Sequence, residues 1–483
     1  MSEPLIYELS SPGRAGVKPP HLDVPESALP ANLLREDLPL PEVSEVDVVR
    51  HYLRLSQLNY AIDKGMYPLG SCTMKFNPKV NEVAARLAGF TGVHPLQDEE
   101  SVQGALYVMY SVQEYLKEIG GFAAMSLQPA AGAHGELTGV LIMRKYHLDH
   151  GDTDRDTILV PDSAHGTNPA STSMSGLRVV EIPSDARGNI DLDALRAQVC
   201  ARVVGLMFTN PNTLGLFEEH TEEVINIVHG CGGLVYGDGA NMNALTGIMR
   251  PGDAGIDVMH FNLHKTFSTP HGGGGPGSGP VGVAAHLADY LPGPIVALDP
   301  ESTADEDPYF TFFDPPKSIG RVKAFWGQFG VIVRAYTYIR MLGSEGVRKA
   351  AEHAVLNANY LLSRIKGAYP LPYDRICKHE FVVEGHLKDA PDVHALDIAK
   401  RLIDYGVHPP TNYFPLIVPE ALMIEPTETE SKQSLDNYAD ILLTIAAEAR
   451  ETPELLHAAP HNAPVRRLDE VRAARNPVLR YAH

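Results

Sequence analysis

At 483 residues the chain is too long for a single hydrophobic core, and its length predicts two or three domains. Hydrophobic residues make up 44% of it, as in ordinary globular proteins, and the formal net charge of −20 argues against nucleic acid and anionic membranes as partners. The sequence shows no secretory signal, no transit peptide and no apolar run long enough to span a bilayer. The four widely spaced cysteines, expected to be reduced thiols in a cytoplasmic protein, are Cys72, Cys200, Cys231 and Cys377.

The first part of the chain is rich in proline and irregular in pattern. Helical segments are expected only at about Val46–Leu58 and Lys79–Leu87. Because such a segment has too little apolar periodicity for a core of its own, we expect it to pack against something larger. Residues 1–95 are therefore predicted to be an N-terminal arm.

A different pattern starts near residue 120, where short apolar runs bounded by turn residues alternate with helical stretches. Helices are expected from about Gly132 to His147 and over Thr221–Gly230. The expected strands are Ile158–Pro161, Val179–Ile182, Val203–Phe208, Leu234–Tyr236, Val258–Leu263 and Val281–Ala284. This alternation predicts an α/β domain with a mostly parallel sheet over residues 96–325.

From about residue 325 the sequence becomes mainly helical. The expected helices are Gly327–Leu342, Val347–Lys366, Val393–Tyr405 and Ser431–Ala449. Two strands are expected between them, Phe381–Val383 and Ala421–Ile424. We interpret residues 326–483 as a smaller α+β C-terminal domain, with a tail from about residue 452 on its surface.

Candidate site residues follow the predicted strands of the large domain. In open α/β sheets, ligands bind beyond the carboxyl ends of the strands. His165 follows the strand ending at Pro161, Asp238 follows the strand ending at Tyr236, and His264 with Lys265 follow the strand ending at Leu263. The sequence therefore predicts that these side chains meet at one edge of the sheet.

Lys265 suggests a particular chemistry. A desolvated lysine amine reacts with carbonyl groups, and pyridoxal phosphate is the cofactor that most often uses such a lysine. Its pyridine nitrogen needs an acidic partner, for which Asp238 is available upstream. Small residues at Gly132 and Ala133 open a predicted helix, whose N-terminal N–H groups favour a phosphate.

Each of these features has an ordinary structural explanation when taken alone. A lone lysine is usually on the surface, and an aspartate between glycines is usually a turn former. A formal GxGxxG match at Gly272, Gly274 and Gly277 is rejected as a dinucleotide site, because nearby prolines would break the helix it requires. His260, His264 and His271 lack the spacing of a metal site, and no metal is expected. The interpretation depends on the conjunction of all the features in one domain.

Long motifs then resemble one family closely. The chain is similar to glycine decarboxylase, the P-protein of the glycine cleavage system, over nearly its whole length, and specifically to its second, lysine-bearing half. The motifs that carry the resemblance are Tyr67-Pro68-Leu69-Gly70-Ser71-Cys72-Thr73-Met74-Lys75, Ser163-Ala164-His165-Gly166-Thr167-Asn168-Pro169-Ala170, Asp238-Gly239-Ala240-Asn241-Met242-Asn243, Asn262-Leu263-His264-Lys265-Thr266-Phe267, Pro270-His271-Gly272-Gly273-Gly274-Gly275-Pro276-Gly277 and Ile424-Glu425-Pro426-Thr427-Glu428.

The resemblance implies the aspartate aminotransferase-like fold type I of pyridoxal-phosphate-dependent transferases. By family position Lys265 carries the cofactor, Asp238 pairs with its pyridine nitrogen, and His165 stacks on its ring. Gly132, Ala133 and His134 match the phosphate loop, although His134 stands where some relatives have glutamine. Ala240 matches the residue on the other face of the ring, and His264 lies beside Lys265. Topology alone, not the resemblance, places Thr209 or Asn210 near the ring's phenolic oxygen.

The implied activity is decarboxylation of glycine with transfer of the aminomethyl group to the lipoyl group of a carrier protein, the H-protein. A separate sister subunit is implied, and the loop His271–Pro280 is a candidate wall of the channel for the lipoyl arm. Two alternatives remain: another fold type I enzyme, such as an amino-acid decarboxylase or a carbon–sulfur lyase, or a non-catalytic scaffold. No residue is singled out for the glycine carboxylate, although Arg321 and Arg375 are available.

Overall fold

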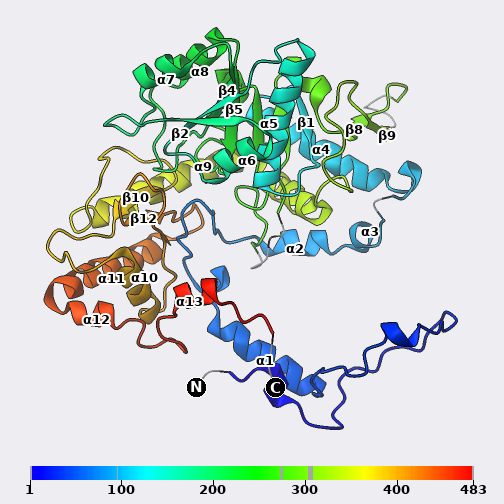
Figure 1. The fold of residues 1–483 in the computed structure, drawn as a ribbon, viewed down its shortest axis with the longest axis vertical. Coiled ribbons are helices and arrows are strands. Elements are labelled where there is room, and N and C mark those ends of the chain that lie inside the picture. Colours follow the sequence, from blue (N-terminus) through cyan, green and yellow to red (C-terminus); the bar gives the residue numbers. More distant parts are fainter. Residues whose placement is uncertain (1–2, 95, 272–274, 276, 303–307, 481–483) are drawn as a thin grey trace. The chain divides into compact units, whose positions relative to one another are not determined.

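The computed structural model describes residues 3–94, 96–271, 275, 277–302 and 308–480 (Figure 1). Two compact units are present, one comprising Gly65–Ala458 and the other Met1–Lys64 together with Ala459–His483. Most of the glycine-rich segment at His271–Gly277 lies outside the described residues, including Gly272–Gly274 and Pro276. Among the described residues, no helix combines the length and the apolar character needed to cross a membrane.

A seven-stranded sheet in the order β1-β7-β6-β5-β4-β2-β3 is the centre of the larger unit (Figure 1). Its strands are β1 (Ala124–Ser126), β2 (Thr157–Pro161), β3 (Arg178–Ile182), β4 (Val203–Phe208), β5 (Leu234–Gly239), β6 (Val258–Phe261) and β7 (Val281–Val283). Only β7 runs antiparallel to its neighbours. The predicted mostly parallel sheet is therefore confirmed.

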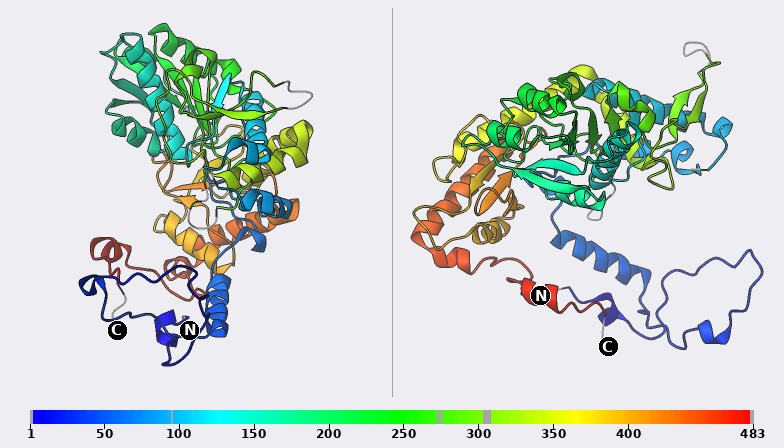
Figure 2. Two further views of the ribbon diagram at one scale, coloured as in Figure 1. Left: turned by 90° about the vertical axis from the view of Figure 1, so that its right-hand side faces the viewer. Right: turned by 45° about the horizontal axis from the view of Figure 1, so that its top comes forward.

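Helices cover both faces of this sheet, because successive side chains of its strands point to opposite sides. In β4, Leu206 and Phe208 belong to one hydrophobic core and Met207 to another. Val140 and Met143 of helix α5 join the core of Met207. The helices are α4 (Gln103–Gly120), α5 (Gly132–Asp149), α6 (Thr167–Met174), α7 (Leu192–Gln198) and α8 (Thr221–Gly230), and Figure 2 shows the sheet between them.

Helix α5 approaches the sheet closely at a glycine. A Cβ atom at Gly139 would lie 2.4 Å from Cε2 of Tyr236 on β5, a distance that real side chains do not tolerate. The absence of a side chain at this position therefore lets α5 pack directly on β5. The N-terminus of α5 is thereby held at the same edge of the sheet as the end of β5.

The C-terminal part of the larger unit is built on helix α9 (Phe329–Ile365). Its hydrogen-bonded run contains two helical segments that meet at Gly343, where φ is 64°, so the two predicted helices meet end to end. The first segment packs on α4 and the second on α11. The other elements are β10 (Phe381–Glu384), α10 (Ala395–Asp404), β11 (Thr411–Asn412), β12 (Ala421–Ile424), α11 (Lys432–Glu451) and α12 (Pro453–His457).

The small antiparallel sheet β10-β12-β11 and the helices around it enclose a separate hydrophobic core. The C-terminal part of the larger unit therefore has the predicted α+β arrangement. The predicted strand Ala421–Ile424 is the central strand of its three-stranded sheet. No element is predicted over α4, β1 or the two-stranded ribbon of β8 (Ile295–Leu298) and β9 (Phe310–Phe313).

The smaller unit contains α1 (Glu45–Leu58) and α13 (Glu470–Arg475). The hydroxyl of Ser44 accepts a hydrogen bond from the Asp47 N–H and caps the start of α1. Among described residues 3–64 no hydrophobic side chain is buried, and Val17 is 82% exposed.

The remaining short helices are α2 (Lys79–Ala85) and α3 (Ala88–Thr91), with 3₁₀ turns at Ile6–Leu9, Ala31–Leu33, Ile62–Lys64, Glu99–Ser101, Pro251–Ala254 and Ala285–Tyr290.

Candidate active site

A cavity of about 210 Å³ lies at the carboxyl edge of the central sheet. All of the site residues predicted from sequence line it, apart from His134: Gly132, Ala133, His165, Thr209, Asp238, Ala240, His264 and Lys265. The sequence reasoning did not identify Ser71, Glu136, Thr167, Asn262, His379 and Glu380 as site residues, although they line the same cavity. A larger cavity of about 380 Å³ beside α4 is mainly apolar and contains none of the predicted residues.

Lys265 projects into the cavity from the loop that follows β6. Its Nζ donates a hydrogen bond of 2.6 Å to the backbone carbonyl of Ser71. Ser71 has a φ of 64° and Thr73 a φ of 50°, so the Tyr67–Lys75 segment adopts a strained backbone beside this amine. Strain of this kind is concentrated at functional sites, because the surrounding structure must hold it in place.

Asp238 lies within β5, two residues beyond the strand end that the sequence predicts, and is 5% exposed. Its Oδ1 accepts a hydrogen bond from the Ala240 N–H, and its Oδ2 accepts one from the Asn168 side chain, both of 3.0 Å. Burial by itself would raise the pKa of Asp238, but nearby His260 and these hydrogen bonds outweigh it and lower that pKa. The cavity therefore presents an ionised carboxylate.

A second carboxyl group, Glu136 of α5, lies close to Asp238. Asn168 bridges the two, because its Nδ2 donates to Glu136 Oε2 and to Asp238 Oδ2, each over 3.0 Å. Burial and the charge of Asp238 raise the pKa of Glu136 to about 7. Glu136 therefore titrates near neutral pH, whereas Asp238 stays ionised there.

His165 connects to the same network. Its Nδ1 lies 2.8 Å from the hydroxyl of Thr167, which donates to Glu136 Oε1 over 2.8 Å. Burial lowers the pKa of His165, so the ring is neutral at physiological pH. A neutral ring held at the cavity wall is suited to stacking on a flat ligand.

The N-terminus of α5 borders another part of the cavity. No side chain caps this helix, so its first N–H groups lack partners within it. A Cβ atom at Gly132 would lie 2.7 Å from Asn262 Oδ1, which is buried without a hydrogen-bond partner among the described atoms. The unpartnered N–H groups at the start of α5 and the helix dipole are suited to an anion such as a phosphate.

Three other predicted residues have different local environments. The hydroxyl of Thr209 is buried at the cavity without a hydrogen-bond partner among the described residues. His264 accepts a hydrogen bond from the Ser278 N–H, and burial together with Lys265 lowers its pKa to about 3. His134 accepts the Ala130 N–H through Nδ1 and does not line the described cavity wall. Its assignment to the cofactor stays a prediction.

Taken together, these groups fit pyridoxal phosphate. An uncapped helix N-terminus is available for the phosphate, and a buried carboxylate is available for a cationic ring nitrogen. The unpartnered hydroxyl of Thr209 is a further polar group at the cavity, and the amine of Lys265 is available for an aldehyde. The cavity therefore contains groups suited to the phosphate, the ring nitrogen and the aldehyde of the cofactor.

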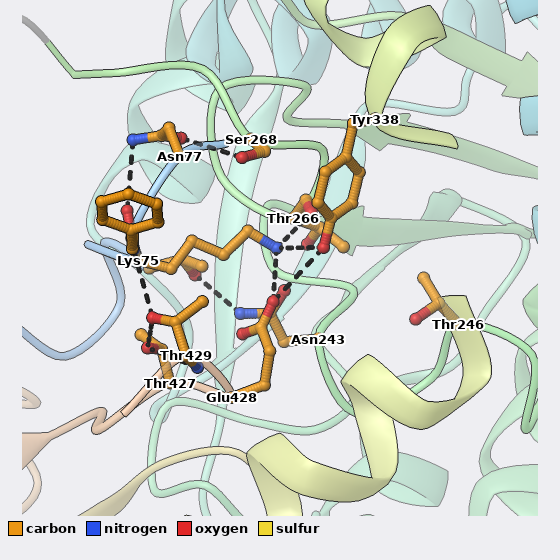
Figure 3. A network of polar contacts seen from close by, with 12 residues as sticks. Lys75, Asn77, Asn243, Thr246, Thr266, Ser268, Tyr338, Thr427, Glu428 and Thr429 are labelled. Carbon is orange, nitrogen blue, oxygen red and sulfur yellow. Dashed lines mark hydrogen bonds and ion pairs between the residues drawn. The ribbon is translucent and has the colours of Figure 1, made fainter. Parts of the chain in front are cut away.

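The Tyr67–Lys75 segment also holds the loop that carries Lys265. Figure 3 shows the ammonium group of Lys75 among three acceptors. Lys75 Nζ donates to the carbonyl of Thr266 over 2.6 Å, to Glu428 over 2.7 Å and to the Tyr338 hydroxyl over 3.0 Å. The Lys75 side chain is 2% exposed and that of Glu428 9%, so this is a buried ion pair. It fixes the backbone immediately after Lys265.

We expect Lys75→Met to lower the free energy of unfolding by about 3–5 kcal/mol, because it leaves Glu428 buried without its cation. Replacing both partners, as in Lys75→Met with Glu428→Met, should cost less than Lys75→Met alone. The exposed pair of Lys349 and Glu345 provides a control, for which Lys349→Met should cost at most about 0.5 kcal/mol. Urea unfolding measures all three variants. A cost for Lys75→Met no larger than the control would contradict the buried pair.

Comparison with known proteins identifies the family. The family described as glycine dehydrogenase, C-terminal domain, matches residues 350–465, and aminotransferase class-V matches residues 132–274. The chain is 59% identical to a probable glycine dehydrogenase (decarboxylating) subunit 2 of Caldanaerobacter subterraneus subsp. tengcongensis, over 99% of this chain and 98% of that protein. It is 56% identical to the protein of the same name from Pyrococcus horikoshii, over 99% and 95%.

The chain belongs to the glycine dehydrogenase (decarboxylating) subunit 2 family. Among solved structures, an inhibitor-bound glycine decarboxylase (P-protein) of the glycine cleavage system has a TM-score of 0.73 at 21% identity, covering 86% of this chain and 93% of that one. A cysteine desulfurase from Thermococcus onnurineus has a TM-score of 0.60 at 15% identity, over 80% and 95%. The predicted family and the fold type I architecture are both confirmed.

Proposed function

We propose that this chain is the lysine-bearing subunit of a glycine decarboxylase. It would use pyridoxal phosphate to decarboxylate glycine and would transfer the aminomethyl group to the lipoyl group of a carrier protein. The observation that supports this most is the meeting of Lys265 and Asp238 in one cavity of a subunit 2 family member. Both groups are needed for this chemistry. Asp238 lies in β5, and Lys265 lies in the loop after the neighbouring strand β6.

When bound, pyridoxal phosphate supplies an aldehyde for amine exchange and an electron sink for the carbanion that remains after loss of CO2. Lys265 would hold the cofactor covalently through its amine. Asp238 would keep the pyridine nitrogen protonated, because a buried carboxylate raises the pKa of a cation beside it. His165 would support the ring face, and the N-terminus of α5 would hold the phosphate.

Two alternatives make different predictions. Another fold type I enzyme would also require Lys265 and Asp238, and the cysteine desulfurase likeness shows that this fold is shared. A scaffold with a relict site would not need Lys265 and Asp238 to line the same cavity. Family membership at 55–59% identity favours the glycine decarboxylase function over both.

Partners and location are part of the proposal. The relatives are named subunit 2, which supports the existence of a separate sister chain, subunit 1. The lipoylated carrier is required by the proposed transfer step. All four cysteines are free thiols, which favours the reducing cytoplasm as the location.

The proposed activity is tested by exchange of the carboxyl carbon of glycine with labelled bicarbonate. The chain is combined with subunit 1, pyridoxal phosphate and a lipoylated carrier, and the label in glycine is measured. Exchange that depends on glycine, carrier and cofactor supports the function. Visible cofactor absorbance without any exchange would favour another fold type I activity, and the absence of such absorbance would favour a scaffold.

For the assembly we expect a complex of this chain with subunit 1, with two copies of each. Residues 3–64 expose many large apolar side chains, such as Leu22 at 68% and Leu40 at 71%, and among the described residues this segment buries none. Such a surface is typical of a segment that another chain covers. Size-exclusion chromatography with light scattering, with and without subunit 1, measures the complex. A homodimer of this chain that exchanges glycine carbon at full rate alone would contradict the expectation.

A further inference from the structure

One wall of the cavity is formed by His379 and Glu380, in the loop immediately before β10. His379 is 1% exposed, and neither of its ring nitrogens has a hydrogen-bond partner among the described atoms. Its Nε2 lies 3.5 Å from Glu380 Oε1, within ion-pair range. Glu380 Oε2 accepts the Ser71 N–H over 2.7 Å, and the Ser71 carbonyl accepts Lys265, so this wall is two contacts from the reactive amine.

A buried metal ion is one possible occupant, because ligand atoms of His379, Glu380 and Glu425 lie within 4.8 Å of one another. The carboxylate of Glu425 already has several protein donors. Its Oε1 accepts from the hydroxyl of Thr73 and from the side chains of Asn241 and Asn243, and its Oε2 accepts from the Thr73 N–H. These donors compete with a cation for the carboxylate. The cluster is better described as a histidine between two carboxylates.

The charge of this histidine follows from its neighbours. Burial by itself would lower the pKa of His379, but Glu380 and Glu425 outweigh it and raise that pKa above the usual value. Protonated imidazole has two N–H donors. Nε2 faces Glu380 Oε1 at 3.5 Å, whereas Nδ1 has no acceptor among the described residues. A buried donor without an acceptor is costly, so a ligand that accepts from it is favoured.

The substrate brings such an acceptor. A glycine carboxylate in this cavity must exchange its water for protein donors. No arginine is among the described residues that line the cavity. Arg375 donates to backbone carbonyls of Arg187 and Phe217, and the guanidinium of Arg321 lies over the ring of Trp326. Neither of the arginines available from sequence is placed to receive the carboxylate.

We propose that His379 binds the carboxylate of the substrate amino acid by donating a hydrogen bond from its ring. This deepens the proposed function and rests on it. A single imidazole contact suits a decarboxylase, because the carboxylate loses its charge as CO2 departs. A bidentate arginine would stabilise the charged ground state more than the transition state and would slow that step.

The test compares two amines that differ by the carboxylate. The complex with subunit 1 and pyridoxal phosphate is titrated with glycine and with methylamine, and the change in cofactor absorbance gives the dissociation constants. For His379→Gln we expect the glycine constant to rise about 10- to 100-fold, the range of a charge-assisted hydrogen bond. The methylamine constant should change by less than about twofold, since that probe has no carboxylate.

Matched variants complete the design. His147 is buried in α5, and its Nε2 is hydrogen-bonded to the carbonyl of Val204 outside the cavity. His147→Gln should therefore change neither the glycine nor the methylamine dissociation constant. His379→Asn replaces the glutamine variant if that variant does not fold. Equal weakening of both amines would show that His379 only shapes the cavity and would overturn the proposal. An unchanged dissociation constant for glycine in His379→Gln would also overturn the proposal. A wild-type complex without any cofactor absorbance would overturn the proposed function itself, which is a separate outcome.

Discussion

Replacing Lys265 by alanine is expected to abolish turnover and the covalent attachment of pyridoxal phosphate, while the fold persists. Lys265 is the lysine that lines the cavity, and it faces Asp238 and the uncapped helix N-terminus across that cavity. Noncovalent binding of the cofactor cannot replace the covalent link, so the exchange activity of the variant should fall to the detection limit of the assay. The hydrogen bond from the side chain to the Ser71 carbonyl contributes only about 1 kcal/mol to stability.

Borohydride reduction followed by peptide mapping measures the attachment site directly. Lys75 is the main competing lysine, since it is buried in the same region, but its ammonium group has three hydrogen-bond acceptors, one of which is its ion-pair partner Glu428. Lys265→Arg is the matched variant, because it retains the positive charge but cannot form the link. Cofactor trapped on Lys75, or turnover in either variant of Lys265, would show that the site is assigned to the wrong residue.

Replacing Asp238 by asparagine is expected to retain cofactor and reduce the rate by roughly 10²–10³-fold, the effect of removing one partner of a buried charge pair. An amide can still accept the Ala240 N–H, so the local structure should persist. It cannot supply the negative charge that keeps the ring nitrogen protonated. Turnover falls while attachment to Lys265 remains, which distinguishes this variant from the lysine variants.

Asp257 is a suitable control for this variant. It is a buried aspartate immediately before β6, and it accepts hydrogen bonds from the Val235 N–H and from His229. Because it lies at the amino end of the same sheet, Asp257→Asn should lower stability without a comparable loss of rate. Exchange kinetics and urea unfolding of both variants separate the two effects. Near-normal exchange by Asp238→Asn would mean that ring protonation is supplied by another group.

The sequence by itself predicted strands β2 to β7 of the large sheet, but not β1, and it singled out the two central groups of the site. Buried parallel strands leave short apolar runs followed by turn residues, and this signal is local. The strand Val203–Phe208 has the same bounds in the structure as in the prediction. Lys265 and Asp238 were identified because the carboxyl ends of parallel strands share one edge, which is a topological rule that needs no coordinates.

Only the tertiary structure decided the rest of the cavity. Glu136 is a single acid within a helix, and nothing in its local pattern distinguishes it from a solvated residue until α5 packs on β5. His379 lies more than a hundred residues from Lys265 in the chain and is connected to it through Glu380 and Ser71. Lys75 and Glu428 pair across 353 positions of the chain. Burial and charge depend on neighbours distant in sequence, so these residues carry no local signal, and packing alone reveals them.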